Sequence, residues 1–193
     1  MKVSIANNRR MIAIAIINLI LLLIIFFLRI NQLYFGAFFS IALLVANELA
    51  FIVLLWYVIS ILQYWGENLS LQTPFTIFLG LQVVNFLVRI LPSRDLSTMD
   101  LGLGVALAIV KIYMAVAAFR VKNEKIKDSF RVLGIILLFD VLFTFGWGMI
   151  PFLPDAIRPS RFLIIANLVQ MFGILYVIHQ NRKQLKAATI IQL

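Results

Sequence analysis

The chain has 193 residues, of which 63% are hydrophobic and only 13% are charged, and its mean hydropathy is +1.04. Soluble domains carry about a quarter charged residues and just under half apolar ones. A water-soluble fold of this length cannot bury so much apolar surface, so the composition excludes one and predicts an integral membrane protein. With no cysteine and one histidine, disulfides and Cys- or His-rich metal sites are excluded, and we expect no metal or cofactor. In a membrane protein, the positions of the basic residues behind the net charge of +9 indicate the topology. We therefore expect no nucleic-acid partner.

Six segments are long and apolar enough to cross a bilayer core about 30 Å thick at about 1.5 Å per residue. We expect them near residues 11–30, 37–62, 74–91, 100–120, 131–152 and 161–180. Because lipid satisfies no backbone hydrogen bonds and strand-like alternation is missing, the spans should be α-helices. The first span has a basic start but no small-x-small cleavage site, which predicts an uncleaved helix. The sequence therefore predicts one all-α domain over residues 1–193, a polytopic bundle of six transmembrane helices.

The lysines and arginines between the spans predict the orientation, because such residues accumulate in short cytoplasmic loops. With the N-terminus inside, eleven basic residues fall on the inner side: Lys2, Arg9, Arg10, Arg120, Lys122, Lys125, Lys127, Arg131, Arg182, Lys183 and Lys186. Five fall on the outer side: Arg29, Arg89, Arg94, Arg158 and Arg161. We therefore expect both termini to be cytoplasmic, in a plasma or inner membrane. One loop fits poorly, since residues 63–73 carry Glu67 and no basic residue.

Three ionisable residues fall near the centres of their spans: Glu48, Lys111 and Asp140. A charge at the bilayer centre costs about 2.5–3.5 kcal/mol on insertion scales, so three would cost roughly 8–10 kcal/mol. That sum is similar to the net stability of a whole domain. Meeting in the bundle interior would avoid most of this cost. We therefore expect the three side chains to cluster.

The second span also carries small residues on the face opposite Glu48. Ala42, Ala46 and Ala50 follow one another at steps of four, which places them on one side of a helix. Small residues mark the faces where membrane helices pack closely. We therefore expect this helix to contact protein on both faces.

Amide side chains occur at the same depth as the three charges, Asn18 among them. The candidate binding or coupling residues are Glu48, Lys111, Asp140, Gln82, Asn85, Asn47, Asn167 and Gln170. Intramembrane acids and bases of this kind mark ion and substrate pathways. The structural alternative is an ion-pair and amide network that only holds the helices together. No catalytic motif is present, so we name no catalytic residue and expect no enzyme.

Two further groups of basic residues are candidate sites. Arginine forks suit phosphate and carboxylate groups, so an outer anion or lipid-headgroup site is a candidate at Arg89, Arg94, Arg158 and Arg161. Snorkelling of these side chains at the helix ends is the structural alternative. The segment 120–131 is the densest run of charge, and it suits a cytoplasmic partner or anionic lipid. The alternative is that it only sets the topology.

These features lead to two hypotheses about function. The first is a small solute or ion carrier, or a membrane-embedded substrate-binding subunit, that uses the polar cluster at mid-depth. In size and span count the chain is similar to the substrate-binding subunits of energy-coupling-factor importers, a likeness of shape without a shared motif. The second is a non-catalytic accessory or scaffold subunit, in which the cluster serves assembly with a membrane-protein partner or in a homo-oligomer.

Overall fold

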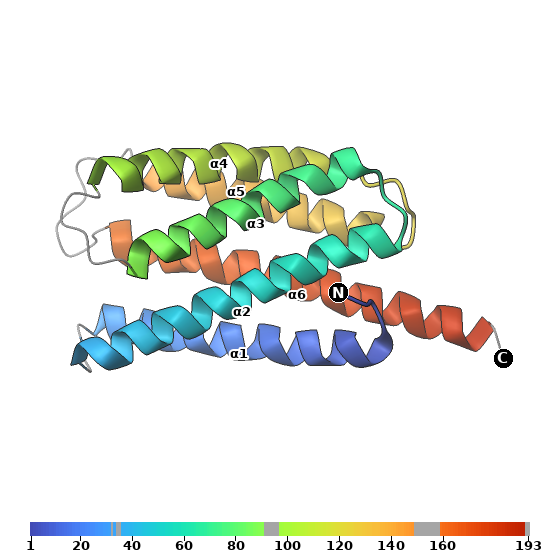
Figure 1. Cartoon of the computed structure of the whole chain (residues 1–193), viewed down its shortest axis with the longest axis horizontal. Helices are drawn as coiled ribbons and strands as arrows, with labels where there is room; N and C mark the ends of the chain where they lie inside the picture. The colour runs from blue at the N-terminus through green and yellow to red at the C-terminus, as the bar shows by residue number, and fades with distance from the viewer. Residues whose placement is uncertain (32, 34–35, 91–96, 149–158, 192–193) are drawn as a thin grey trace.

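In the computed structural model, residues 1–31, 33, 36–90, 97–148 and 159–191 are described, and they form α-helices without any strand. The side chains of residues 37, 89–90, 97–101, 145–148, 159–163 and 189–191 lie outside this description. The helices are α1 (Ile5–Ile30), α2 (Gly36–Tyr64), α3 (Leu69–Ile90), α4 (Ser97–Phe119), α5 (Lys127–Gly148) and α6 (Pro159–Ile191) (Figure 1). The architecture is therefore all-helical, as predicted.

Several helices run further than the predicted spans because polar residues at their ends continue the helix. α1 begins at Ile5, where the hydroxyl of Ser4 caps it by accepting a hydrogen bond from the backbone N–H of Asn7 at 3.2 Å. α3 begins at Leu69, so that Pro74 lies inside the helix and not at its start. α6 continues past residue 180 through the basic tail to Ile191.

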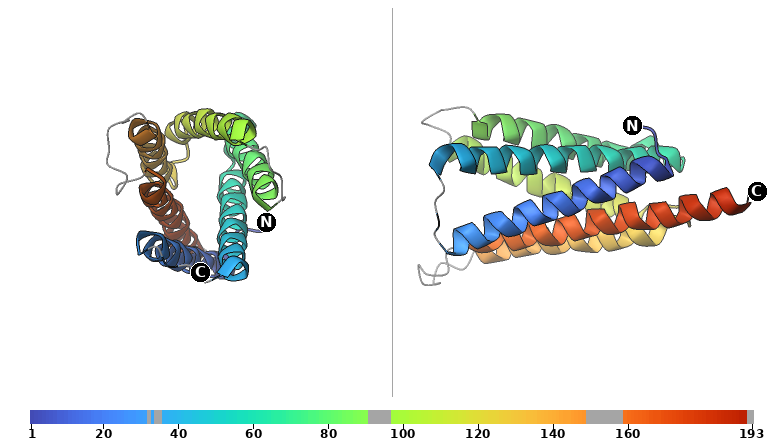
Figure 2. Two further views of the ribbon diagram at one scale, coloured as in Figure 1. Left: turned by 90° about the vertical axis from the view of Figure 1, so that its left-hand side faces the viewer. Right: turned by 90° about the horizontal axis from the view of Figure 1, so that it is seen from below.

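The six helices form a closed ring in chain order. Each helix packs against the next one along the chain, and α6 returns to pack against α1. Figure 2, seen along the bundle, shows the helices as the walls of this ring. α2 also reaches α6. Each helix therefore has one side toward the interior of the ring and one toward the surroundings.

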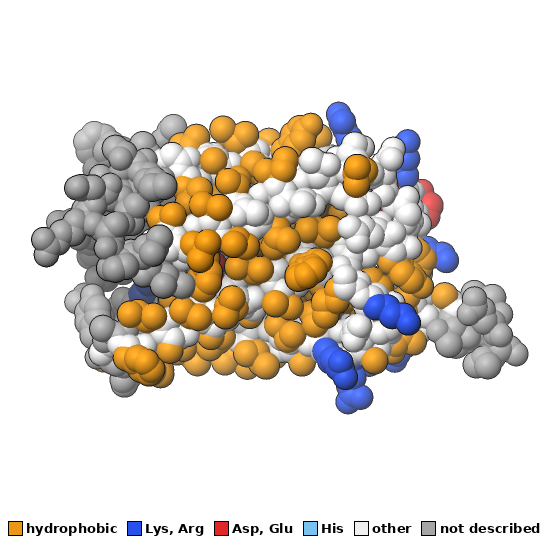
Figure 3. Space-filling view, in the orientation of Figure 1, with side chains coloured by type: hydrophobic (Ala, Val, Ile, Leu, Met, Phe, Trp, Pro, Cys, Tyr) orange, Lys and Arg blue, Asp and Glu red, His pale blue; other side chains and the backbone are white. Residues whose placement is uncertain are grey.

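Five of the helices, α1, α2, α3, α4 and α6, are long and apolar enough within their described parts to cross a membrane. α5 is not among them. The part of α5 whose side chains are described, residues 127–144, carries Lys127, Asp128, Arg131 and Asp140. Large apolar side chains are exposed along the outer surface of the bundle (Figure 3). Lipid is the solvent that such a surface requires.

The prediction that α2 contacts protein on both faces is wrong. Ala42 and Ala46 are exposed, whereas Glu48 on the opposite face is buried. α2 is one wall of the ring: Ala42 and Ala46 face outward, and Ala50 is half-buried. A ridge of alanines therefore did not identify a packing face here.

α4 and α5 approach each other closely at a glycine. A Cβ atom added to Gly134 on α5 would lie 3.1 Å from the backbone oxygen of Ala115 on α4 and 3.3 Å from the ring of Phe119. Ala115 is itself fully buried. Small residues allow membrane helices to approach this closely and to gain van der Waals contact.

We expect Gly134→Ala to destabilise the bundle by about 1–3 kcal/mol relative to Gly80→Ala, since the added methyl group overpacks the α4–α5 contact. Gly80 on α3 has no atom within 4 Å of the equivalent Cβ position, so its substitution controls for the higher helix propensity of alanine. The free energy of unfolding in detergent measures the difference. Equal stability of the two variants would contradict this close approach.

Candidate functional site

The interior of the ring contains a cavity of about 150 Å³ at the middle of the bundle. Side chains of five helices form its wall: Asn18, Leu22, Asn47, Glu48, Phe51, Gln82, Asn85, Leu107, Lys111, Asn167, Gln170 and Met171. All the predicted binding or coupling candidates except Asp140 are in this wall. Asn18 is also there, a residue predicted at this depth but not among the binding candidates. The structure therefore brings residues far apart in the sequence to one place.

Asp140 is connected to the cavity through Lys111. The Nζ atom of Lys111 donates to Oδ2 of Asp140 at 2.5 Å, which joins α4 to α5. The Asp140 side chain is 1% exposed and that of Lys111 is 16% exposed. The ammonium group also lies 5.8 Å from the centroid of the Phe78 ring. Asp140 is not in the cavity wall, but it is paired with the lysine that is. α5 therefore contributes to the site through this ion pair.

Hydrogen bonds between amides join α1 to α2 at the same cavity. The Nδ2 atom of Asn18 donates to the backbone oxygen of Asn47 at 2.8 Å and to Oδ1 of the same residue at 3.2 Å. Glu48, the next residue along α2, is buried and faces the cavity. The polar wall is thus organised by contacts between helices.

Two buried polar atoms of the wall keep unused hydrogen-bonding capacity. Oδ1 of Asn18 and Nε2 of Gln170 have no hydrogen-bond partner among the described residues. Asn18 is 0% exposed and Gln170 is 2% exposed. Since buried polar groups are almost always hydrogen-bonded, these atoms leave one acceptor and one donor of the wall unsatisfied among the described residues.

The predicted outer arginine site lies largely outside the described residues. Arg94 and Arg158 are not described at all. Arg89 and Arg161 belong to α3 and α6, but their side chains are outside the description. An anion or headgroup site on that side therefore stays a prediction.

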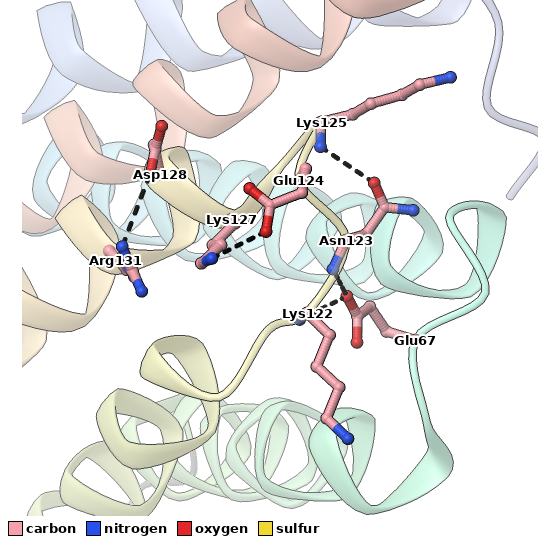
Figure 4. A network of polar contacts seen from close by, with 8 residues as sticks. All are labelled: Glu67, Lys122, Asn123, Glu124, Lys125, Lys127, Asp128 and Arg131. Carbon is pink, nitrogen blue, oxygen red and sulfur yellow. Dashed lines mark hydrogen bonds and ion pairs between the residues drawn. The ribbon is translucent and has the colours of Figure 1, made fainter.

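A second polar network joins the α2–α3 turn to the α4–α5 loop (Figure 4). The Oε1 atom of Glu67 accepts from the backbone N–H groups of Lys122 at 2.9 Å and Asn123 at 2.7 Å. The Nδ2 atom of Asn123 donates to the backbone oxygen of Trp65 at 3.0 Å. The acidic turn, which fitted the orientation poorly, is thus bound to the most basic loop of the chain.

The charges of segment 120–131 are largely used within the protein. Lys127 donates to the carboxylate of Glu124 at 2.8 Å, and this hydrogen bond lowers the pKa of Glu124. Arg131 lies 3.8 Å from Asp128, and Lys125 lies 4.9 Å from the centroid of the Trp65 ring. These contacts favour a structural role for three of the basic residues in the segment.

Comparisons with protein family models, with curated proteins and with solved structures find no match for this chain. Among the described residues, no group of three or more acidic or histidine side chains is placed to hold a metal ion. The case for a function therefore depends on the cavity and on the surfaces of the bundle.

We expect Lys111→Met to destabilise the bundle by about 3–5 kcal/mol, since it leaves the Asp140 carboxyl group buried without its partner. The double variant Lys111→Met/Asp140→Leu removes both charged groups and should recover most of this loss. The free energy of unfolding of the two variants and the parent tests the pair. A double variant no more stable than the single one would contradict the ion pair.

We expect Glu67→Ala to accelerate hydrogen exchange at the backbone N–H groups of Lys122 and Asn123, because both lose their acceptor. The lost bonds would correspond to about 1–3 kcal/mol of local stability. Glu67→Gln keeps an acceptor oxygen at the same position and should change exchange much less. Similar exchange in Glu67→Ala and the parent would show that the loops are held by other contacts.

Proposed function

We propose that the chain is a multi-pass protein of a plasma or inner membrane, with all six helices spanning and both termini cytoplasmic. Both termini, the α2–α3 turn and the α4–α5 loop lie at one end of the bundle (Figure 1). Basic side chains gather at that end in Figure 3, which is the arrangement of a cytoplasmic side. The Glu67 network supports this orientation, because it binds the acidic α2–α3 turn to the basic α4–α5 loop and so accounts for an acidic residue on the basic side.

The proposal includes α5 as a spanning helix. It packs lengthwise between α4 and α6. Its charged start, from Lys127 to Arg131, directly follows the α4–α5 loop, which lies at the end of the bundle with both termini (Figure 1). The remaining charge, Asp140, is paired with Lys111. Pairing and burial in protein are the conditions under which a membrane helix tolerates an acid.

Within this bundle, we propose that the central cavity binds a small polar solute as part of its transport, without a catalytic step. The chain would act as a carrier or as a membrane-embedded substrate-binding subunit. The observation that carries the proposal is the polar wall contributed by five helices, with Asn18 and Gln170 offering unused acceptor and donor atoms. A cavity near 150 Å³ holds a molecule about the size of benzene, or roughly six non-hydrogen atoms.

The chemistry of the wall indicates the class of solute. Its amides offer both donors and acceptors, and the charge of Lys111 is offset by Asp140. A neutral or zwitterionic solute with several hydrogen-bonding groups matches this wall best. Glu48 stays the candidate for coupling to a cation or proton.

The second candidate is a scaffold subunit, in which the same residues only assemble the bundle or a complex. The specific observation in its favour is that Lys111–Asp140 and Asn18–Asn47 each join two helices. In that case, loss of an amide would change stability or partner retention, not solute binding.

The two candidates are separated by Gln170→Leu, with Gln180→Leu on the same helix but outside the cavity wall as the matched control. Thermal unfolding in nanodiscs is followed with a panel of amino acids, short polyols, small amides and alkali or ammonium salts. We expect some member of the panel to stabilise the parent and the control. Gln170→Leu should bind this solute up to about tenfold more weakly, because it loses one buried hydrogen bond.

The carrier proposal would be contradicted if no member of the panel stabilised the parent, or if Gln170→Leu bound the solute as tightly as Gln180→Leu. Loss of a co-purified membrane protein from Gln170→Leu alone would support the scaffold role instead.

A further inference from the structure

A basic groove lies on the outside of the bundle, between α1 and α6. Its walls carry Arg9 and Arg10 of α1 together with Arg182 of α6. Ile5, Ala6 and Ala13 of α1 also line it, and its volume is about 670 Å³. The groove lies at the end of the bundle that holds both termini (Figure 1), and it is separate from the central cavity.

The groove belongs to the face of α1 that points away from the ring. The buried side of α1 is the stripe Asn8, Met11, Ala15, Asn18 and Leu22. At about 100° per residue, the groove residues of α1 fall on the opposite side of the helix. A ligand in the groove would therefore approach from the lipid side.

Among the described residues, the three guanidinium groups have no carboxylate partner. Arg9 and Arg10 are exposed, and the ion pairs recorded for the described residues involve none of the three arginines. The Nε atom of Arg182 is buried and has no hydrogen-bond partner among the described residues. Guanidinium forks bind phosphate oxygens in pairs, with charge-assisted hydrogen bonds.

An exposed apolar stripe continues the groove along the same face of α1. Its residues follow Arg9 and Ala13 at helical steps of three and four: Ile16, Ile17, Ile20, Leu23, Ile24 and Phe27. From Ile16 to Phe27 the stripe is about 16 Å long, at about 1.5 Å per residue. Its length is thus similar to the thickness of one leaflet of a hydrocarbon core about 30 Å thick.

We propose that this groove binds the phosphate headgroup of an anionic phospholipid, whose acyl chain lies on the apolar stripe of α1. Basic pockets between membrane helices near the cytoplasmic surface bind headgroups of this kind. The stripe is what distinguishes a lipid from a free phosphate ion, because only a lipid uses both parts of the surface. The inference does not depend on what the central cavity binds.

The test is lipid retention by the purified protein in detergent, measured by native mass spectrometry with phosphatidylglycerol and with phosphatidylcholine of the same acyl chains. The groove variant is Arg9→Gln/Arg10→Gln/Arg182→Gln. The matched control, Arg120→Gln/Lys122→Gln/Lys186→Gln, removes three exposed charges from the same end of the bundle but outside the groove. We expect the groove variant to lose at least tenfold in affinity for phosphatidylglycerol and the control to lose less than twofold, with weak phosphatidylcholine binding throughout.

Equal losses in the two variants would overturn the proposal in favour of diffuse surface charge. So would retention of phosphatidylglycerol by the groove variant. Inorganic phosphate is added as a competitor, and full displacement of the lipid at millimolar phosphate would assign the groove to a free anion. If the triple variant does not fold, Arg182→Gln alone serves as the test, because it leaves Arg9 and Arg10 in place. It should weaken phosphatidylglycerol binding about threefold or more.

Discussion

Hydrocarbon neither solvates charge nor completes hydrogen bonds, and this constraint organises the whole bundle. Polar side chains on membrane helices are stable only where protein or water meets them. In this chain, five helices place amides, a carboxylate and an ammonium group around one cavity, and the sixth pairs its acid with that ammonium group. The ring of helices in chain order is what makes one shared interior available to all of them.

The same constraint separates three environments on the molecule. The interior at mid-depth is polar, the outer surface along the helices is apolar, and basic residues gather at the end with the termini. The Glu67 network holds two loops together at that end, and the arginine groove lies on the outer face of α1. The two proposals therefore use different surfaces, one for a solute inside the ring and one for a lipid outside it.

The sequence predicted the helical class and the clustering of Glu48, Lys111 and Asp140, because insertion cost depends mainly on composition and depth. The structure pairs Lys111 with Asp140 and places Glu48 in the wall of the same cavity as Lys111. The sequence did not predict which faces would meet. The alanines of α2 suggested a packing face, yet Ala42 and Ala46 are exposed, since a small residue permits close packing but does not require it. The role of Glu67 was also hidden, because its partners are backbone N–H groups of a distant loop. Contacts with backbone groups cannot be recognised from the residue types in a sequence. Binding by the cavity stays a prediction.

If the bundle is built around a polar interior, the amides of the cavity face water or solute while their neighbours on the same helices face lipid. The chain has no cysteine, so single cysteines at Asn85 and Gln170 can be compared with Leu87 and Phe172, which are exposed on the outer surface. Labelling by a small water-soluble thiol reagent in native membranes measures which side is wet. We expect reaction at positions 85 and 170 and none at 87 and 172. The reverse pattern, or no reaction at the cavity positions, would contradict a polar interior.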